Sequence, residues 1–204
     1  DKERKNILIN SIRANKIYLT GEELTVASLE DILERTTTDD DIFHLQSDSW
    51  AKKLEYPVNS SSYNNFKDTV FALRNNEGVN TTSLSRSIGF LKAYPNLSFS
   101  DFSSVALTLN RVRRTTPDIK RIIDFVQGDK FSATTASSTY KSEKLNEYLG
   151  ILENGTRQQR TVLKSAVRHG KIVLTDKETT AANLAEALRI ASSEDDYHLQ
   201  EIKR

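Results

Sequence analysis

A segment near the start of the chain returns in similar form near its end, and this internal repeat constrains the fold more than any other feature. The first copy spans residues 16–33 and the second spans residues 171–188. At a constant offset, the positions whose residue type recurs are Leu8, Arg13, Lys16, Ile17, Leu19, Thr20, Glu23, Thr25, Ala27, Leu29 and Leu33. Ordinary composition gives only about two chance identities in such a window. We interpret the similarity as a duplication within the chain.

Each copy is predicted to form a helix, a short strand and a second helix. Leu8 and Ile12 are one helical turn apart, and this spacing predicts a helix over residues 2–14. Ile17 and Leu19 then alternate with polar residues, as the corresponding residues do in the second copy, and this alternation predicts a strand. Thr25 occupies the position of an N-cap before the second helix, and its counterpart is Thr180.

The segment between the copies is predicted to be a set of helices. Apolar spacing predicts a helix over residues 66–74, a second that Thr82 caps and that ends before Pro95, and a third that Ser100 or Asp101 caps. A fourth helix is expected from Pro117 to Gln127, with Gly128 as its stop signal. Residues 129–142 are rich in Ser, Thr and Ala and are predicted to be a linker.

These patterns predict a mainly α protein with minor β, in which a helix-strand-helix unit is duplicated at the two ends. The expected divisions are residues 1–46 for the first copy, 47–128 for a central helical core, 129–142 for the linker, and 143–204 for a helix followed by the second copy. The strands at residues 17–19 and 172–174 are expected to pair with each other. Pairing between chains is the alternative, and it leaves a homo-oligomer open.

Composition excludes several classes of function. No window approaches the run of about twenty apolar residues that a membrane helix needs, so no membrane partner is expected. The chain has no cysteine, which excludes disulfides and thiolate chemistry and fits a reducing compartment such as the cytoplasm, or a virion. It also contains no methionine and begins at Asp1, so we expect a processed form or a fragment of a longer protein.

The charge pattern of the helix before each predicted strand indicates a binding surface. In the second copy, basic residues recur at spacings of three and four and form one stripe of a helix. These residues are Arg157, Arg160, Lys164, Arg168 and Lys171. Most of the stripe recurs in the first copy, as Lys2, Lys5, Arg13 and Lys16. Two such stripes could hold phosphate groups of a nucleic acid or the carboxylates of an acidic protein surface.

Further basic residues lie in the centre of the chain. One cluster consists of Arg111, Arg113, Arg114, Lys120 and Arg121. Arg86 belongs to a different pattern, in which two helices joined by a turn at Gly78 resemble a helix-turn-helix DNA reader that presents Ser83, Ser85, Arg86 and Ser87. Because two helices joined by a turn are common in all helical proteins, this interpretation is weaker than that of the stripes.

The sequence provides little support for catalysis, a metal site or a cofactor. The three histidines are His44, His169 and His198, and no zinc spacing, phosphate-binding glycine loop or nucleophile motif accompanies them. The acidic run that ends at Asp41 could bind a cation, but capping of a helix N-terminus explains it more simply. No catalytic residue, metal ligand or cofactor is therefore predicted.

The function expected from these patterns is non-enzymatic nucleic-acid binding, or a role in a nucleoprotein, with basic helix faces on phosphate. The alternative is a structural or scaffold protein of a larger assembly, such as a virion, whose duplicated units mediate subunit contacts. An enzyme is the third hypothesis and would need its chemistry in a part of a longer protein. The sequence does not identify the partner, does not distinguish DNA from RNA as a ligand, and does not determine the oligomeric state.

Overall fold

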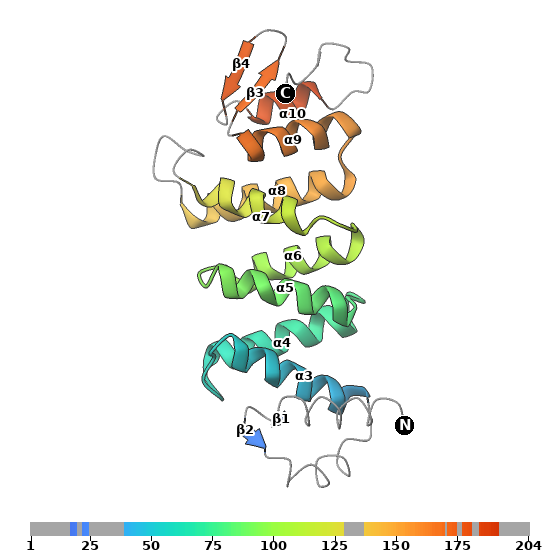
Figure 1. The fold of residues 1–204 in the computed structure, drawn as a ribbon, viewed down its shortest axis with the longest axis vertical. Helices are drawn as coiled ribbons and strands as arrows, with labels where there is room; N and C mark the ends of the chain where they lie inside the picture. Colours follow the sequence, from blue (N-terminus) through green and yellow to red (C-terminus); the bar gives the residue numbers. More distant parts are fainter. Residues whose placement is uncertain are drawn as a thin grey trace. The chain divides into compact units, whose positions relative to one another are not determined.

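A computed structural model describes the chain as mainly helical (Figure 1). The residues that it describes are 17–19, 22–24, 39–128, 137–169, 171–174, 177–180 and 184–191. The chain divides into two compact units, residues 1–99 and residues 100–204. The predicted linker at residues 129–142 is therefore not the division between the units but lies inside the second of them.

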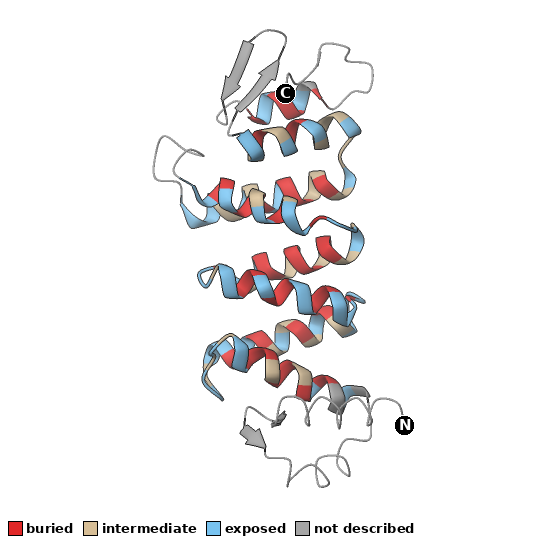
Figure 2. Ribbon diagram, in the orientation of Figure 1, coloured by how far each residue is buried: buried red, intermediate tan, exposed pale blue. Residues whose placement is uncertain are grey.

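Unit 1 contains a short hairpin and a group of helices. Its elements are β1 (Ile17–Leu19), β2 (Glu22–Leu24), α3 (Asp39–Lys53), α4 (Ser61–Asn75) and α5 (Thr81–Ala93). Helix α3 packs against α4 and α5. Phe66 and Val70 of α4 and Leu84 of α5 are fully buried, and each contributes about 1.5–3 kcal/mol through burial of its apolar side chain. Figure 2 shows buried and exposed residues alternating along these helices, as expected for helices with one apolar face.

Side-chain caps determine where several helices begin. Ser60, Asn80 and Ser137 precede α4, α5 and the helix that starts at Ser138, and each accepts a hydrogen bond from a backbone N–H of the first turn. The predicted cap at Thr82 is wrong, because Asn80 has this role and Thr82 lies inside α5. Asparagine and threonine are both good caps, so the sequence around this turn allowed either position.

The C-terminus of α3 is closed by a Schellman motif. The Tyr56 N–H donates to the carbonyl oxygen of Ala51 at 3.1 Å, and the Glu55 N–H donates to that of Lys52 at 3.0 Å. Glu55 occupies the left-handed position, with φ of 59°. Glycine is the usual residue at this position because a Cβ atom is disfavoured there. The motif is therefore formed at an energetic cost.

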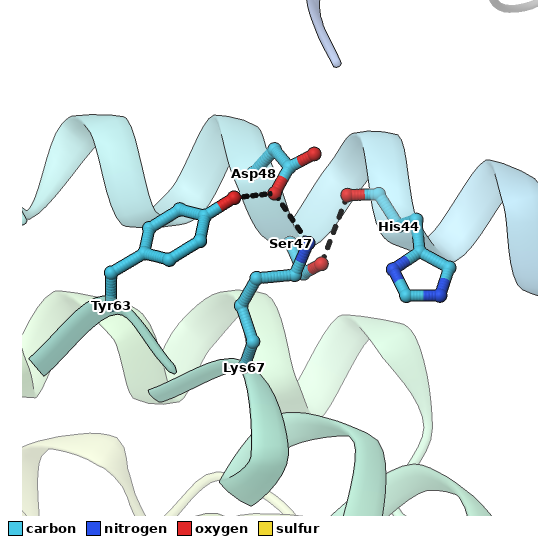
Figure 3. A network of polar contacts seen from close by, with 5 residues as sticks. All are labelled: His44, Ser47, Asp48, Tyr63 and Lys67. Atoms are coloured by element: carbon cyan, nitrogen blue, oxygen red, sulfur yellow. Dashed lines mark hydrogen bonds and ion pairs between the residues drawn. The ribbon is translucent and has the colours of Figure 1, made fainter. Parts of the chain in front are cut away.

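A buried polar network joins α3 to α4 (Figure 3). Asp48 is completely buried, and its Oδ1 atom accepts hydrogen bonds from the Tyr63 hydroxyl group, at 2.6 Å, and from the Lys67 ammonium group. Its Oδ2 atom is buried without a hydrogen-bond partner among the described residues. Because a buried carboxylate is costly without partners, Tyr63 and Lys67 are needed to hold α3 on α4 in this arrangement.

Unit 2 contains five helices and a second hairpin among its described residues. Its elements are α6 (Phe99–Arg111), α7 (Thr116–Gln127), α8 (Ser138–Asn154), α9 (Arg157–His169), β3 (Lys171–Leu174), β4 (Lys177–Thr180) and α10 (Leu184–Ile190). Phe99 itself belongs to unit 1. Helix α7 packs against α8 and α9, and α9 packs against α10. Ile119, Ile122 and Leu163 are fully buried in this core.

Polar contacts hold α8 beside α6. Asp101, near the start of α6, accepts hydrogen bonds from the side chains of Ser142 and Asn146. Thr108, near the other end of α6, donates from its hydroxyl group to Glu153 at 2.6 Å. Since Asp101 and Thr108 are buried, these bonds satisfy groups that water cannot reach.

The predicted helix boundaries agree with the structure for α7 and differ for α8 and α6. Pro117 and Gly128 mark the ends of α7 as expected. Helix α8 already begins at Ser138, inside the predicted linker, because Ser137 caps it. Helix α6 starts at Phe99 rather than after a cap at Ser100 or Asp101.

The short strands also differ from the prediction. β1 pairs with β2, and β3 pairs with β4, each as a separate antiparallel pair, so the expected pairing between the two ends of the chain is wrong. Thr180 lies in β4 and does not cap a helix, because α10 begins only at Leu184. The predicted helix over residues 2–14 and the predicted cap at Thr25 lie outside the described residues, so the duplicated unit remains a prediction. No described helix is long and apolar enough to cross a membrane.

We expect the substitution Glu55→Gly to raise the free energy of unfolding by about 0.5–1 kcal/mol, because it removes the Cβ penalty of the left-handed residue. Chemical denaturation followed by circular dichroism measures this change. Glu77→Gly is the matched control, since Glu77 is also an exposed turn residue but is not among the residues with positive φ. An equal gain in both variants would contradict the role of the Schellman motif.

Two tyrosines are expected to ionise only in strongly alkaline solution. Burial raises the pKa of Tyr63 and of Tyr148 above the ordinary value of 10.0, and the hydrogen bond to Asp48 raises that of Tyr63 further. The raised pKa values stabilise the fold below pH 10.0, and this contribution is lost as pH rises through them. Near-ultraviolet absorbance titrations of the folded and denatured protein measure the effect, and Tyr63→Phe or Tyr148→Phe should each remove one late titration. Identical curves for the folded and denatured protein would contradict it.

Candidate anion-binding surface

Helix α9 begins with a capping box formed by Thr156 and Gln159. The Thr156 hydroxyl oxygen accepts from the Gln159 N–H at 3.1 Å, and the Gln159 side-chain oxygen accepts from the Thr156 N–H at 3.0 Å. The same side chains reach α10, because Thr156 donates to the carbonyl oxygen of Ala191 and Gln159 donates to that of Leu188. One pair of side chains therefore starts α9 and fixes the C-terminal end of α10 against it.

The body of α9 is apolar on one face and basic on the other. Val162, Leu163 and Ala166 are buried. The basic residues Arg157, Lys164 and Arg168 are exposed, and Arg160 is half-buried. At 1.5 Å per residue, the row from Arg157 to Arg168 is about 16 Å long. The helix contains no acidic residue, so no carboxylate of its own neutralises this row.

A carboxylate from another helix reaches the middle of the row. Asp118, in the first turn of α7, lies 3.1 Å from the Lys164 ammonium nitrogen and 3.7 Å from a guanidinium nitrogen of Arg121. The Asp118 side chain is only 15% exposed, whereas those of Lys164 and Arg121 are 48% and 42% exposed. Lys164 and Arg121 therefore share one negative charge. Arg157, Arg160 and Arg168 form no ion pair with any described residue.

Glu153 brings the central basic cluster to the start of this row. Its second carboxylate oxygen lies 3.2 Å from a guanidinium nitrogen of Arg111, the last residue of α6, and Glu153 itself is close to the end of α8. The turn after α6 and the turn after α8 consequently lie at the same end of unit 2 (Figure 1). The turn after α6 carries the exposed residues Arg113 and Arg114.

We group six basic residues as the unit 2 basic surface, because Arg113 and Arg114 lie shortly before Asp118 of α7, which contacts Lys164 of α9. Its members are Arg113, Arg114, Arg157, Arg160, Lys164 and Arg168. Arg113 and Arg114 form no ion pair with any residue in the described part of the chain. Concentrated positive charge with few partners can bind phosphate or carboxylate groups of a polyanion.

Other basic residues of the prediction are neutralised within unit 2. Arg111 is paired with Glu153, and Lys120 is paired with Asp124 at 2.7 Å. The prediction grouped Arg111, Lys120 and Arg121 with Arg113 and Arg114, but the structure gives the first three carboxylate partners. The central cluster is therefore smaller as a free positive surface than its sequence indicates.

The helix-turn-helix interpretation loses two of its four base-reading residues. Ser83 and Ser87 are buried, and the Ser87 hydroxyl group donates to the carbonyl oxygen of Leu84 within α5. Arg86 is exposed on the same helix, but it belongs to unit 1. A buried serine cannot reach a base edge, so of the four predicted residues only Ser85 and Arg86 are placed to contact DNA.

The remaining predicted residues cannot be placed on this surface. Lys2, Lys5, Arg13 and Lys16 lie outside the described residues. The prediction that Lys171 continues the stripe of the helix is wrong, because α9 ends at His169 and Lys171 begins β3. His44 and His169 are exposed. The centroid of the His44 ring lies 4.3 Å from that of the Phe71 ring. Among the described side chains, no group of three or more histidine, aspartate or glutamate residues could hold a metal ion.

Sequence reasoning missed the two carboxylates that shape the surface. Asp118 lies 46 residues from Lys164 along the chain, and Glu153 lies 42 residues from Arg111. Only the fold brings the helices of each pair together. The capping box was also missed, although Thr156 followed by Gln159 before an apolar run is a recognisable signal.

Comparison of the chain with models of protein families, with curated proteins and with solved structures gives no match. The functional assignment therefore depends on the chemistry of the described residues. Among the described helices, α9 carries the largest number of Lys and Arg residues, four, and it carries no acid.

We expect Glu153→Ala to lower the free energy of unfolding by about 1–3 kcal/mol, because it leaves the buried Thr108 hydroxyl group without its acceptor. Chemical denaturation measures the change. Glu143→Ala removes an exposed glutamate from the same helix and should change stability by less than about 0.5 kcal/mol. Equal effects of the two substitutions would show that Glu153 does not hold α8 to α6.

Proposed function

We propose that this chain is a non-enzymatic nucleic-acid-binding protein, or the nucleic-acid-binding part of a nucleoprotein, that holds phosphate groups on the unit 2 basic surface. The main support is α9, whose exposed face carries a row of cations about 16 Å long and no carboxylate. A single strand of B-form geometry places a phosphate every 3.4 Å along the axis, so the row can face several phosphates at once.

The charges at the end of the row support the same proposal. Arg113 and Arg114 lie in the turn before α7, at the end of unit 2 where Arg157 begins α9. Arginine binds phosphate oxygens through two parallel N–H groups, so three arginines near one end offer a denser phosphate site than the row alone. No exposed aromatic residue is assigned to this surface, so backbone contacts rather than base stacking would provide the affinity.

The second candidate is a scaffold protein of a larger assembly, whose duplicated end units contact other subunits. One observation favours the duplication. The pairing of Tyr18 with Glu23 in the first hairpin corresponds to that of Val173 with Glu178 in the second, at the offset of the sequence repeat. Two similar units in one chain could contact two equivalent neighbours in an assembly. Light scattering that detects self-association in the presence of nuclease would favour this candidate.

The test of the first proposal is charge reversal at Arg160 and Arg168. We expect the double variant Arg160→Glu/Arg168→Glu to weaken binding of a labelled oligonucleotide by at least about tenfold, because two phosphate contacts become repulsive. Fluorescence anisotropy across a series of salt concentrations measures affinity. For single strands, the slope of log affinity against log salt should be about −3 to −4 in the parent protein and smaller in magnitude by about 1.5 in the variant.

The matched control is Lys53→Glu/Lys92→Glu, which makes the same change in net charge on exposed lysines of unit 1. This control should bind within about twofold of the parent protein, because the effect depends on contact with phosphate rather than on net charge alone. Single- and double-stranded DNA and RNA should be compared in the same assay. If the parent protein binds none of them at low salt, or if both double variants lose affinity equally, the proposal is wrong.

A further inference from the structure

Asp118 is the only carboxylate that contacts a cation of the unit 2 basic surface among the described residues. Its Oδ2 atom lies 3.1 Å from Lys164, and its Oδ1 atom lies 3.7 Å from Arg121. Each oxygen thus faces one cation, as the oxygens of a bound phosphate would. All three side chains come from the packed helices α7 and α9.

We propose that Asp118 is a specificity-determining residue of this surface, which acts as a built-in competitor for the phosphate groups of a polyanion. The proposal depends on the function proposed above. An incoming phosphate that binds Lys164 must share this cation with Asp118 or displace it. An isolated phosphate gains little binding free energy from that exchange, because Asp118, which Lys164 shares with Arg121, already half-neutralises the charge of Lys164.

A polymer with adjacent phosphates can offset the competition with Asp118 through further contacts. It can contact Arg157, Arg160 and Arg168, which have no carboxylate partner among the described residues, at the same time as Lys164. The contacts on either side of Lys164 supply the free energy that the competition with Asp118 removes. Asp118 therefore favours extended polyanions over mononucleotides and free phosphate.

The position of Asp118 explains why it can have this role without loss of stability. It lies in the first turn of α7, where the positive end of the helix stabilises a carboxylate. Its side chain is mostly buried, so water screens its attraction to Lys164 less than in an exposed pair. The exposed pair of Lys120 with Asp124, on the same helix, lacks these two features and does not involve α9.

The experiment compares Asp118→Asn with Asp124→Asn, two isosteric changes that add the same charge to α7. For a labelled single-stranded oligonucleotide at low salt, Asp118→Asn should increase affinity by about three- to tenfold, and the salt slope should steepen by about 1. It should increase the affinity for a labelled mononucleotide by a larger factor than the affinity for the oligonucleotide, because the monomer has no other contacts, and equal factors would contradict a role in specificity. Asp124→Asn should change both affinities by less than about twofold.

A double-mutant cycle separates this role from a structural one. In the Lys164→Gln background, Asp118→Asn should give a smaller increase than in the parent protein, because one of the two released cations is absent. Circular dichroism confirms that each variant is folded. Equal increases for Asp118→Asn and Asp124→Asn, or no increase with Asp118→Asn, would overturn the inference while leaving the proposed function intact. Absence of binding by the parent protein and by every variant would overturn both.

Discussion

Burial of one apolar face per helix is the constraint on which the rest of this structure depends. Helix α9 makes the constraint clear, because Val162, Leu163 and Ala166 are its buried residues and its opposite face is strongly basic. Once the apolar face is buried, the cations must point away from the core. The orientation of the basic row therefore follows from hydrophobic packing and requires no specific contact of its own.

Polar contacts then decide how the packed helices are aligned. The capping box of Thr156 and Gln159 ties the start of α9 to the end of α10, and Glu153 ties the end of α8 to the end of α6. Such bonds contribute only about 0.5–1.5 kcal/mol each to stability, but a buried group without a partner costs more. They therefore select one alignment among several of similar apolar burial. In unit 2, the selected alignment places Arg113 and Arg114 at the end where α9 begins.

The outcome for individual predictions follows the range of the interactions involved. The mainly helical class, the ends of α7 at Pro117 and Gly128, and the basic stripe of α9 depend on neighbours within about one helical turn, and sequence spacing predicts them well. The pairing of the strands was predicted wrongly because alternation marks a strand without naming its partner. The cap of α5 was misplaced because Asn80 and Thr82 are both suitable caps.

The sequence by itself determined that α9 has a basic face, because helical periodicity places Arg157, Arg160, Lys164 and Arg168 on one side whatever surrounds them. Only the tertiary structure decided which of these cations are already paired. Asp118 reaches Lys164 from α7, a helix distant along the chain. Electrostatic attraction depends on separation in space, and the packing of α7 against α9 determines that separation.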